Sequence, residues 1–350
     1  MKVVALTAIG HLELQERNMP VPQAGEVLLK VMASGLCGSD VPRAYQTGTL
    51  SFPRVLGHEF AGRVEAVGLG GDPALIGKRM AVFPIVPCMT CEFCQHHHHH
   101  YPRCLNYSSY GSRRDGGFSE YLTVPEFNLV EFPDHVSYSA AAMLEPATIA
   151  LHVIRRANLD LNDSIVIIGA GPIGLMAARW ATIYGAQKVM LIDVDPKKVE
   201  FCRELGFEHV CLATEEDAVE WVLKETDGFG AHVTIEGSGS CAGLTQALLA
   251  CRVYGKVMLM GNPHGDMQIP REVYDKVMRK EAVIASVYNS VYKQMPHDEW
   301  ADAAAAISSG KLQVNDLISH QVEIDSVIDL FDTFHHRRGF TCKGMMVTKE

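Results

Sequence analysis

The sequence predicts an α/β protein with a β-rich domain and a second domain built on a parallel sheet. The chain of 350 residues is long enough to form two cores. Up to about residue 145, short strand-like runs are separated by Gly, Pro and Asp. From about residue 164, apolar strands alternate with helical segments. Because this alternation is typical of parallel sheets, we expect helices on both faces of the second sheet.

The end of the chain is expected to return to the β-rich domain, because the alternation is lost after about residue 290. The elements expected in that domain are strands at 26–32, 62–67, 79–84 and 344–347 and a helix at 298–308. The sequence therefore predicts a discontinuous first domain, residues 1–146 with 291–350, and a second domain at 147–290.

The second domain begins with the clearest strand of the chain, the apolar run at 164–168. Five more strands are expected at 188–193, 209–212, 232–236, 256–260 and 282–287. Helices are expected at 175–184 and 196–205, with others between the later strands. This order predicts a doubly wound sheet.

The composition excludes several classes of function. The formal net charge is −10 and no long basic run is present, which argues against binding to nucleic acid or to an anionic membrane. The longest apolar stretch, 165–178, is too short for a transmembrane helix and contains glycines and a proline. The N-terminus lacks a secretory pattern, and the cysteines lack the spacing of a disulfide framework. We therefore expect a cytoplasmic protein.

A group of four cysteines has the spacing of a structural zinc site. Cys88, Cys91 and Cys94 are separated by two residues each, and Cys104 can supply a fourth thiolate. Four thiolates close the tetrahedral shell of zinc and leave no open position. The histidines at 96–100 stand between the third and fourth cysteines, and we assign them no function, whether they are natural or engineered.

A second group contains different metal ligands. Cys37 and His58 can bind zinc as thiolate and imidazole, and either Glu59 or Glu145 can complete the set. A histidine alone more often packs in a core, but the combination favours a metal. Such a mixed site leaves zinc an open position, where it acts as a Lewis acid on a hydroxyl or carbonyl group.

Two further residues are expected to support this metal site. Asp40 can orient the imidazole of His58 by accepting a hydrogen bond from its other nitrogen. Ser39 can transfer the proton that a substrate hydroxyl loses. Both lie within three residues of Cys37, so one short segment supplies a metal ligand and its support.

A glycine-rich loop indicates a dinucleotide site, because it follows an apolar strand and opens a helix. Gly169 permits a tight turn, Gly171 lets a pyrophosphate approach the backbone, and Gly174 lets the helix pack closely on the strand. Pro172 and Ile173 complete the loop at the start of the helix, whose positive end favours phosphate.

The residue that follows the next strand indicates which dinucleotide is bound. Asp193 lies 24 residues after Gly169 and can accept hydrogen bonds from both ribose hydroxyls. A carboxylate there repels a 2′-phosphate, and Val194 follows it rather than an arginine. The sequence therefore predicts NAD rather than NADP. The alternative is an ordinary turn in which Asp193 caps the next helix.

These motifs together resemble the polyol branch of the zinc-containing medium-chain dehydrogenases. The shared segments, which span nearly the whole chain, are 37–40, 57–60, the four cysteines, 115–121, 145–146, and 169–174 with Asp193. The resemblance implies a GroES-like catalytic domain, a Rossmann domain, NAD and two zinc ions per chain. It implies that hydride passes from a secondary hydroxyl to NAD in a homodimer or homotetramer.

The resemblance also bears on single positions. Glu145 stands where simple alcohol dehydrogenases have a second cysteine, as in polyol dehydrogenases. Pro42 stands where many alcohol dehydrogenases have a relay histidine, so the proton must leave by another path, through Ser39 and Glu145 with water. Nine residues separate Cys94 from Cys104, a longer gap than is usual, which a loop can absorb.

More narrowly, the segments 37–43, 111–117 and 278–281 are similar to those of galactitol-1-phosphate 5-dehydrogenases. This implies oxidation of galactitol 1-phosphate to tagatose 6-phosphate. Arg113 and Arg114 are candidates for the phosphate, although surface pairing explains them equally well. Arg43 and Lys343 are further basic candidates, and Lys343 can instead approach the cofactor phosphates.

Other functions stay open at this stage. The first alternative is a dehydrogenase of an unphosphorylated polyol such as sorbitol, or of another secondary alcohol such as threonine. Such an enzyme needs no positively charged side chain in its substrate site, because its substrate carries no phosphate. A non-enzymatic protein that binds zinc or nucleotide is less favoured, because it predicts a broken metal set or phosphate loop and the sequence contains neither.

Overall fold

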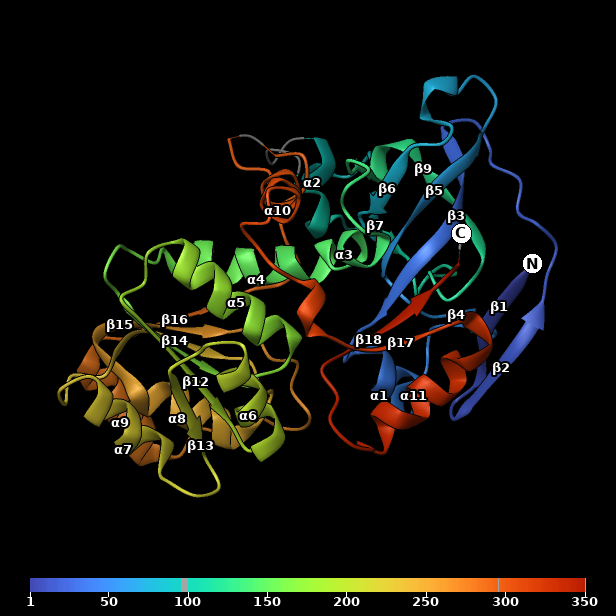
Figure 1. Ribbon diagram of the computed structural model, residues 1–350. Helices are drawn as coiled ribbons and strands as arrows, with labels where there is room; N and C mark the ends of the chain where they lie inside the picture. The colour runs from blue at the N-terminus through green and yellow to red at the C-terminus, as the bar shows by residue number, and fades with distance from the viewer. Residues whose placement is uncertain (96–99, 295, 350) are drawn as a thin grey trace. The chain divides into compact units, whose positions relative to one another are not determined.

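The computed structural model describes residues 1–95, 100–294 and 296–349, which fall into two compact units (Figure 1). The first unit contains residues 1–148 and 290–350, and the second contains 149–289. The predicted division, at 146 and 291, lies close to this one. The histidines at 96–99 lie outside the described residues.

The first unit is organised around a long central strand, β3 (Glu26–Leu36). It pairs antiparallel with β5 (Glu59–Val67), β9 (Tyr121–Pro125) and β18 (Lys343–Val347). In Figure 1 the last strand, coloured red, lies beside the blue strand β3. The end of the chain therefore returns to the first unit.

Shorter elements complete the first unit. The seven-stranded sheet also contains β6 (Arg79–Val82), β10 (Leu129–Glu131) and β17 (Ile318–Val322). Two smaller sheets join β1 (Lys2–Ala8), β2 (His11–Glu16) and β4 (Arg54–Val55), and β7 (Ile85–Val86) and β8 (Ser108–Ser109). The helices are α1 (Asp40–Pro42), α2 (Glu92–Gln95), α3 (Tyr138–Ala142), α10 (Glu299–Ser308) and α11 (Val327–His335), while α4 (Leu144–Ala157) continues into the second unit.

The second unit contains a six-stranded parallel sheet in the order β13-β12-β11-β14-β15-β16. The strands are β11 (Ser164–Ile168), β12 (Lys188–Asp193), β13 (His209–Leu212), β14 (Ala231–Glu236), β15 (Cys251–Leu259) and β16 (Val283–Ser286). All six predicted strands are present, although β15 begins earlier than expected. Strand order reverses between β11 and β14, the position at which such sheets bind ligands.

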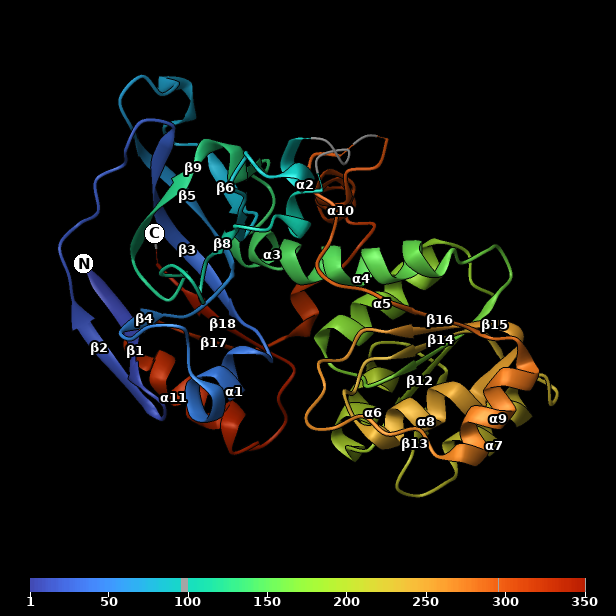
Figure 2. The same cartoon turned by 180° about the vertical axis from the view of Figure 1, so that it is seen from behind.

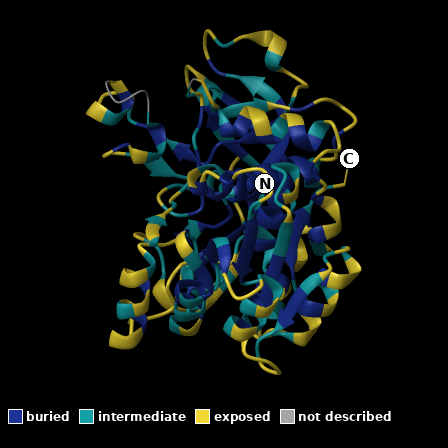
Figure 3. Ribbon diagram, turned by 90° about the vertical axis from the view of Figure 1, so that its left-hand side faces the viewer, coloured by how far each residue is buried: buried dark blue, intermediate teal, exposed yellow. Residues whose placement is uncertain are grey.

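Helices cover both faces of this sheet, as predicted (Figure 2). They are α5 (Pro172–Ile183), α6 (Pro196–Glu204), α7 (Ala218–Glu225), α8 (Cys241–Ala250) and α9 (Arg271–Lys280). The side chain of Asp195 caps α6 by accepting from the Lys197 amide, and Pro196 fits the first turn because it needs no donor. β11 is buried along its whole length and β12 and β14 over most of theirs, whereas helices expose their outer faces (Figure 3). No helix among the described residues is long and apolar enough to cross a membrane.

Candidate functional site

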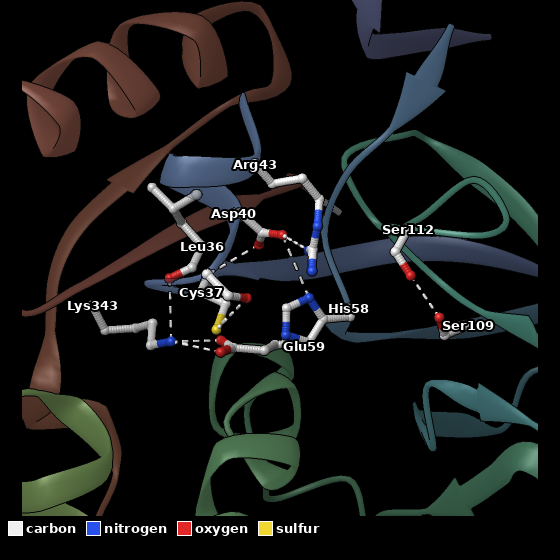
Figure 4. A network of polar contacts seen from close by, with 10 residues as sticks. Leu36, Cys37, Asp40, Arg43, His58, Glu59, Ser109, Ser112 and Lys343 are labelled. Carbon is white, nitrogen blue, oxygen red and sulfur yellow. Dashed lines mark hydrogen bonds and ion pairs between the residues drawn. The ribbon is translucent and has the colours of Figure 1, made fainter. Parts of the chain in front are cut away.

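Cys37, His58 and Glu59 come together at one point of the first unit (Figure 4). A thiol sulfur, a ring nitrogen and a carboxylate oxygen all lie within 4.8 Å of one another. Strand pairing explains how they meet: Cys37 directly follows β3, Glu59 begins the antiparallel β5, and Gly35 pairs with Glu59. This donor set suits zinc with an open fourth position.

Asp40 lies directly behind the imidazole of His58. Its Oδ1 is 3.5 Å from His58 Nδ1 and accepts a 3.1 Å hydrogen bond from Arg43 Nη1, while its Oδ2 accepts from the Cys37 amide at 3.2 Å. Burial opposes ionisation, but His58 and Arg43 lower the pKa of Asp40. This carboxylate therefore leaves Nε2 of His58 as the nitrogen for a metal.

The environment of His58 favours a positive charge between it and Cys37. Burial lowers the pKa of His58, but the charges of Asp40 and Cys37 outweigh it and raise that pKa well above the usual value. A surrounding that stabilises a proton on the ring also stabilises a cation at the same place. Together with the three ligand atoms that lie within 4.8 Å of one another, this environment fits a divalent metal.

A buried lysine, which the sequence did not reveal as part of this group, holds Glu59. Lys343 Nζ donates to both carboxylate oxygens at 2.8 and 2.6 Å and to the Leu36 carbonyl at 3.2 Å. The two side chains are 3% and 1% exposed. Lys343 therefore contacts Glu59 in this unit, where the sequence had left open an approach to cofactor phosphates.

The close approach of β3 and β5 requires a glycine beside this pair. A Cβ atom on Gly35 would lie 2.3 Å from Glu59 Oε2, so any larger residue would displace the carboxylate. Nothing near Lys343 in the sequence indicates this contact, because 284 positions separate it from Glu59.

Glu145 and Ser39 lie around the cluster in different ways. Glu145 is buried at the start of α4, and burial raises its pKa to about 7, with His58 opposing and Glu59 adding to the shift. It stands outside the group whose ligand atoms lie within 4.8 Å of one another, among the described residues. Ser39 Oγ donates to Cys37 Sγ at 3.3 Å. Of the two carboxylates that the sequence left open, Glu59 is the one in that group.

The four predicted cysteines also come together. Cys88, Cys91, Cys94 and Cys104 have sulfur atoms within 4.8 Å of one another. Cys91 Sγ lies 3.5 Å from Cys94 Sγ and 3.8 Å from Cys104 Sγ. Zinc–sulfur bonds of about 2.3 Å in a tetrahedron place the sulfurs about 3.8 Å apart. The longer gap before Cys104 is thus absorbed by its loop, and the set fits a structural zinc.

Backbone amides donate hydrogen bonds to the sulfur atoms of these four cysteines. The Cys88 amide donates to Cys104 Sγ at 3.1 Å, and the Cys91 amide donates to Cys88 Sγ at 3.3 Å. Hydrogen bonds from Thr90 lower the pKa of Cys88 to about 5, whereas burial raises the pKa of Cys94 to about 12. Donors aimed at sulfur stabilise thiolates, the form that binds zinc.

The glycine loop of the second unit has the shape expected of a phosphate site. Gly169 has a φ of +103°, which favours glycine, and a Cβ on Gly174 would lie 2.1 Å from the Gly169 carbonyl oxygen. A Cβ on Gly171 would meet no atom within 4 Å. The backbone at Gly171 is therefore open to a ligand, and Pro172 and Ile173 begin α5 behind it.

Asp193 ends β12 and is held firmly in place. Its Oδ2 accepts from the Ala170 amide at 2.8 Å, and its Oδ1 accepts from the amides of Val194 and Asp195 at 2.8 and 3.0 Å. These contacts join the carboxylate to the glycine loop. Lys198 Nζ is 3.9 Å away. The carboxylate keeps acceptor capacity for ribose hydroxyls, because each oxygen accepts more than one hydrogen bond.

Arg113 and Arg114 are both engaged by neighbours in their own turn. Arg113 Nη1 donates to the Tyr107 carbonyl at 3.1 Å, and its guanidinium lies 4.2 Å from the centre of that ring. The guanidinium of Arg114 lies 4.8 Å from the ring centre of Tyr110. Neither donates in these contacts to a residue of the Cys37 cluster, so their predicted role toward a phosphate stays a prediction.

Comparison with known families gives two matches. Residues 23–134 match the alcohol dehydrogenase GroES-like domain, and residues 172–309 match the zinc-binding dehydrogenase family. These matches confirm the predicted combination of a GroES-like and a Rossmann domain.

Individual proteins agree with the family matches. The chain is 32% identical to galactitol 1-phosphate 5-dehydrogenase of Escherichia coli K12, covering 93% of this chain and 94% of that protein. It is 35% identical to sorbitol dehydrogenase of Bacillus subtilis, covering 75% of each chain. Relatives that act on different polyols are thus similar to comparable degrees.

Solved structures extend the comparison to the whole fold. Galactitol-1-phosphate dehydrogenase from Escherichia coli superposes with a TM-score of 0.92 at 30% identity, covering 99% of this chain and all (100%) of that one. A short chain alcohol dehydrogenase from Escherichia coli CFT073, complexed with cofactor NADH, gives 0.89 at 29% identity and 99% of each chain. The chain therefore belongs to the zinc-binding alcohol dehydrogenases, enzymes that transfer hydride between an alcohol and a nicotinamide cofactor, typically NAD.

Proposed function

We propose that this enzyme oxidises a secondary hydroxyl of a sugar-alcohol phosphate with NAD, converting galactitol 1-phosphate to tagatose 6-phosphate. The observation that carries the proposal is the meeting of Cys37, His58 and Glu59 on one unit of a chain whose other unit has an open phosphate loop. Metal ligands and a dinucleotide site in one chain are what hydride transfer from an alcohol needs.

Each residue of the metal cluster has a distinct part in this reaction. Cys37, His58 and Glu59 would hold the zinc, while Asp40 fixes the tautomer of His58 and Lys343 holds the carboxylate of Glu59. Zinc bound there supplies a Lewis acid that lowers the pKa of the substrate hydroxyl. The contacts of Asp40 and Lys343 fix two of these ligand side chains in advance, which would lower the entropy cost of orienting a substrate there.

Proton removal is assigned to Ser39 and Glu145. The hydroxyl of Ser39 lies 3.3 Å from Cys37 Sγ and is positioned to exchange a proton with a group on the metal side. Glu145 is a buried carboxylate beside the same cluster and can hold the proton before it reaches water. Pro42 occupies the place of a relay histidine, so the proton follows this other route.

For the cofactor, the support for NAD comes from Asp193 and its neighbours. The carboxylate is tied to the Ala170 amide beside the loop, where a ribose follows the pyrophosphate. Val194 is 64% exposed and offers no charge to a 2′-phosphate. The backbone amides at the start of α5 receive the pyrophosphate.

The substrate is tested by following NADH absorbance with purified, zinc-loaded enzyme. We expect kcat/KM for galactitol 1-phosphate to exceed that for galactitol, sorbitol or L-threonine by at least about 100-fold, the effect of a charged anchor worth about 3 kcal/mol. Equal values for galactitol and its phosphate would remove the phosphate from the proposal. A preference for sorbitol would establish the alternative, which the sorbitol dehydrogenase relative supports.

A second test concerns the metal ligand. Cys37→Ser is expected to abolish turnover while NAD still binds, because the phosphate loop lies in the other unit. Unchanged turnover would contradict the assignment of the catalytic zinc. NAD binding is followed by the fluorescence change of NADH on titration, so loss of activity is separated from loss of the cofactor site.

We also propose that the chain forms a homo-oligomer through the edge strand β16, and that it works in the cytoplasm. β16 pairs with β15 on one side and ends the sheet order on the other. Val283 and Ile284 are 55% and 45% exposed, and Ile284 lines a mainly apolar groove of about 310 Å³ to which α9 contributes Tyr274, Val277 and Met278. Among the described residues no strand pairs with the outer edge of β16, and such an apolar edge favours addition of a strand from a second copy.

A further inference from the structure

Arg43 places a guanidinium group beside the metal cluster, and no step of the proposed reaction uses it. It follows α1 directly, and its Nη1 donates to Asp40 Oδ1 at 3.1 Å. The same oxygen lies 3.5 Å from His58 Nδ1. One carboxylate oxygen thus lies between the guanidinium of Arg43 and the imidazole of His58, which would hold the metal, and Figure 4 draws the two groups side by side.

The guanidinium keeps donors that Asp40 does not use. Arginine carries five N–H groups, and the contact to Asp40 occupies one of them. Within residues 1–95, 100–294 and 296–349, the remaining N–H groups of the Arg43 guanidinium have no hydrogen-bond acceptor. The Arg43 side chain is 26% exposed, whereas Asp40 is fully buried at 0%. Asp40 therefore holds the inner edge of the guanidinium, and the outer edge stays accessible.

The other basic side chains considered for the phosphate are less suited to bind it. Lys343 is 3% exposed, and its ammonium group donates hydrogen bonds to Glu59 and to a backbone carbonyl. Arg113 donates to a carbonyl in its own turn, and Arg114 lies over the ring of Tyr110. In the described part of the chain, Arg43 combines contact with the cluster and free donors.

We propose that Arg43 binds the phosphate of the substrate and so sets the preference for phosphorylated polyols. This inference rests on the proposed function and names the residue that would determine the specificity for the phosphorylated substrate. A guanidinium presents two parallel N–H groups that match two phosphate oxygens. Asp40 fixes the inner edge, so less side-chain entropy is lost when the phosphate binds.

The alternative is that Arg43 only balances the charge of Asp40, and substrate comparison separates the two roles. We would measure kcat/KM for galactitol 1-phosphate and for galactitol with the wild type, Arg43→Gln and Arg43→Lys. Arg203→Gln is the matched control, since Arg203 is 54% exposed and pairs with Glu200 on a surface helix. Zinc content and circular dichroism are recorded for each variant.

The ratio of the two kcat/KM values is expected to fall about 100-fold in Arg43→Gln, the effect of removing one partner of a charged contact. Arg43→Lys keeps the charge but loses the paired geometry, so its ratio is expected to fall about tenfold. Arg203→Gln is expected to keep the ratio of the wild type. The variants are expected to retain zinc, because Arg43 is not a ligand.

Three results would overturn the inference while leaving the proposed function in place. In the first, the wild type prefers the phosphorylated polyol and Arg43→Gln keeps that preference. In the second, Arg43→Gln lowers kcat/KM for both substrates by one factor, as loss of Asp40 positioning would. In the third, Arg113→Gln or Arg114→Gln removes the preference and Arg43→Gln does not. A wild type without any preference would instead refute the proposed function itself.

A binding measurement covers the case in which Arg43→Gln does not fold. Inorganic phosphate should inhibit the wild type competitively against galactitol 1-phosphate, with an inhibition constant about tenfold weaker in Arg43→Lys. The same inhibition constant in the wild type and Arg43→Lys would overturn the inference.

Discussion

At the scale of single residues, the pair of Lys343 and Glu59 gives the sharpest prediction. Both side chains are buried, and the ammonium is the partner of both carboxylate oxygens. Lys343→Met leaves a buried charge without its partner, so we expect the free energy of unfolding to fall by about 3–5 kcal/mol. Urea denaturation of the variant and the wild type measures this difference.

A double variant and a surface lysine test this reading of the loss. In Lys343→Met with Glu59→Gln the unpaired charge is gone, so most of the lost stability should return. Lys2 pairs with Asp325 on the surface, and Lys2→Met should leave the urea midpoint unchanged. If Lys343→Met unfolded at the same urea concentration as Lys2→Met, the ion pair would contribute nothing to stability.

The pair of Lys343 and Glu59 also shows which residues of the site could not be predicted from the sequence. Cys37, His58 and the four cysteines could be predicted because metal ligands recur in short motifs with fixed spacing. Lys343 could not, because its contact depends on β18 returning to β3 from the far end of the chain. The choice of Glu59 over Glu145 as neighbour of Cys37 likewise depends on the pairing of Gly35 with Glu59.

At the scale of elements, two glycines in the turn between β11 and α5 and in the first turn of that helix are expected to serve different purposes, one for stability and the other for cofactor binding. A Cβ on Gly174 would lie 2.1 Å from the Gly169 carbonyl, so Gly174→Ala should lower stability by about 1–3 kcal/mol. A Cβ on Gly171 meets nothing within 4 Å, and the open space beside this glycine is where such loops receive a pyrophosphate. We therefore expect Gly171→Ala to keep the melting temperature but weaken NAD binding about tenfold.

Calorimetry of NAD binding and thermal melts would check this pair of variants. The two substitutions add the same methyl group three positions apart, so each serves as the control of the other. Full NAD affinity in Gly171→Ala would show that the cofactor does not pass over this glycine.

The elements themselves differed in how well the sequence predicted them. The central strands of the second unit are mostly apolar because helices cover both faces of the sheet, and all six strands were predicted. The hairpin of β1 and β2 was not expected, since β2 is short and largely exposed and its apolar residues are limited to Leu12 and Leu14. β15 extends to Cys251 through exposed residues such as Tyr254, which no apolar run indicates.

At the scale of the whole molecule, the two metal groups should be separable by zinc content. We expect two zinc ions per chain, matching the two ligand groups, and one in either Cys37→Ser or Cys104→Ser. Loss of the structural zinc should also lower the melting temperature, because metal binding contributes to folding. Cys37→Ser should melt close to the wild type. Atomic absorption and thermal melts measure both, and two zinc ions retained in Cys104→Ser would contradict the four-cysteine site.

The exposed apolar edge of the sheet at β16 predicts that the chain forms an oligomer. Ile284 and Val283 lie on the free edge of the sheet, with Tyr274 and Met278 exposed beside them on α9. A second copy adding its own β16 would pair the edge and cover this apolar surface in one step. We expect the wild type to sediment at a multiple of the chain mass of 38.4 kDa.

Charge placed on that edge should separate the copies, because a lysine at an edge strand opposes strand addition. Ile284→Lys is therefore expected to sediment as a monomer with an unchanged circular dichroism spectrum. Leu69→Lys is the matched control, since Leu69 is 89% exposed in the first unit and far from β16 in sequence. Sedimentation at micromolar concentration decides between the outcomes. A monomeric wild type, or an oligomer that survives Ile284→Lys, would mean that the apolar edge of β16 does not join two copies.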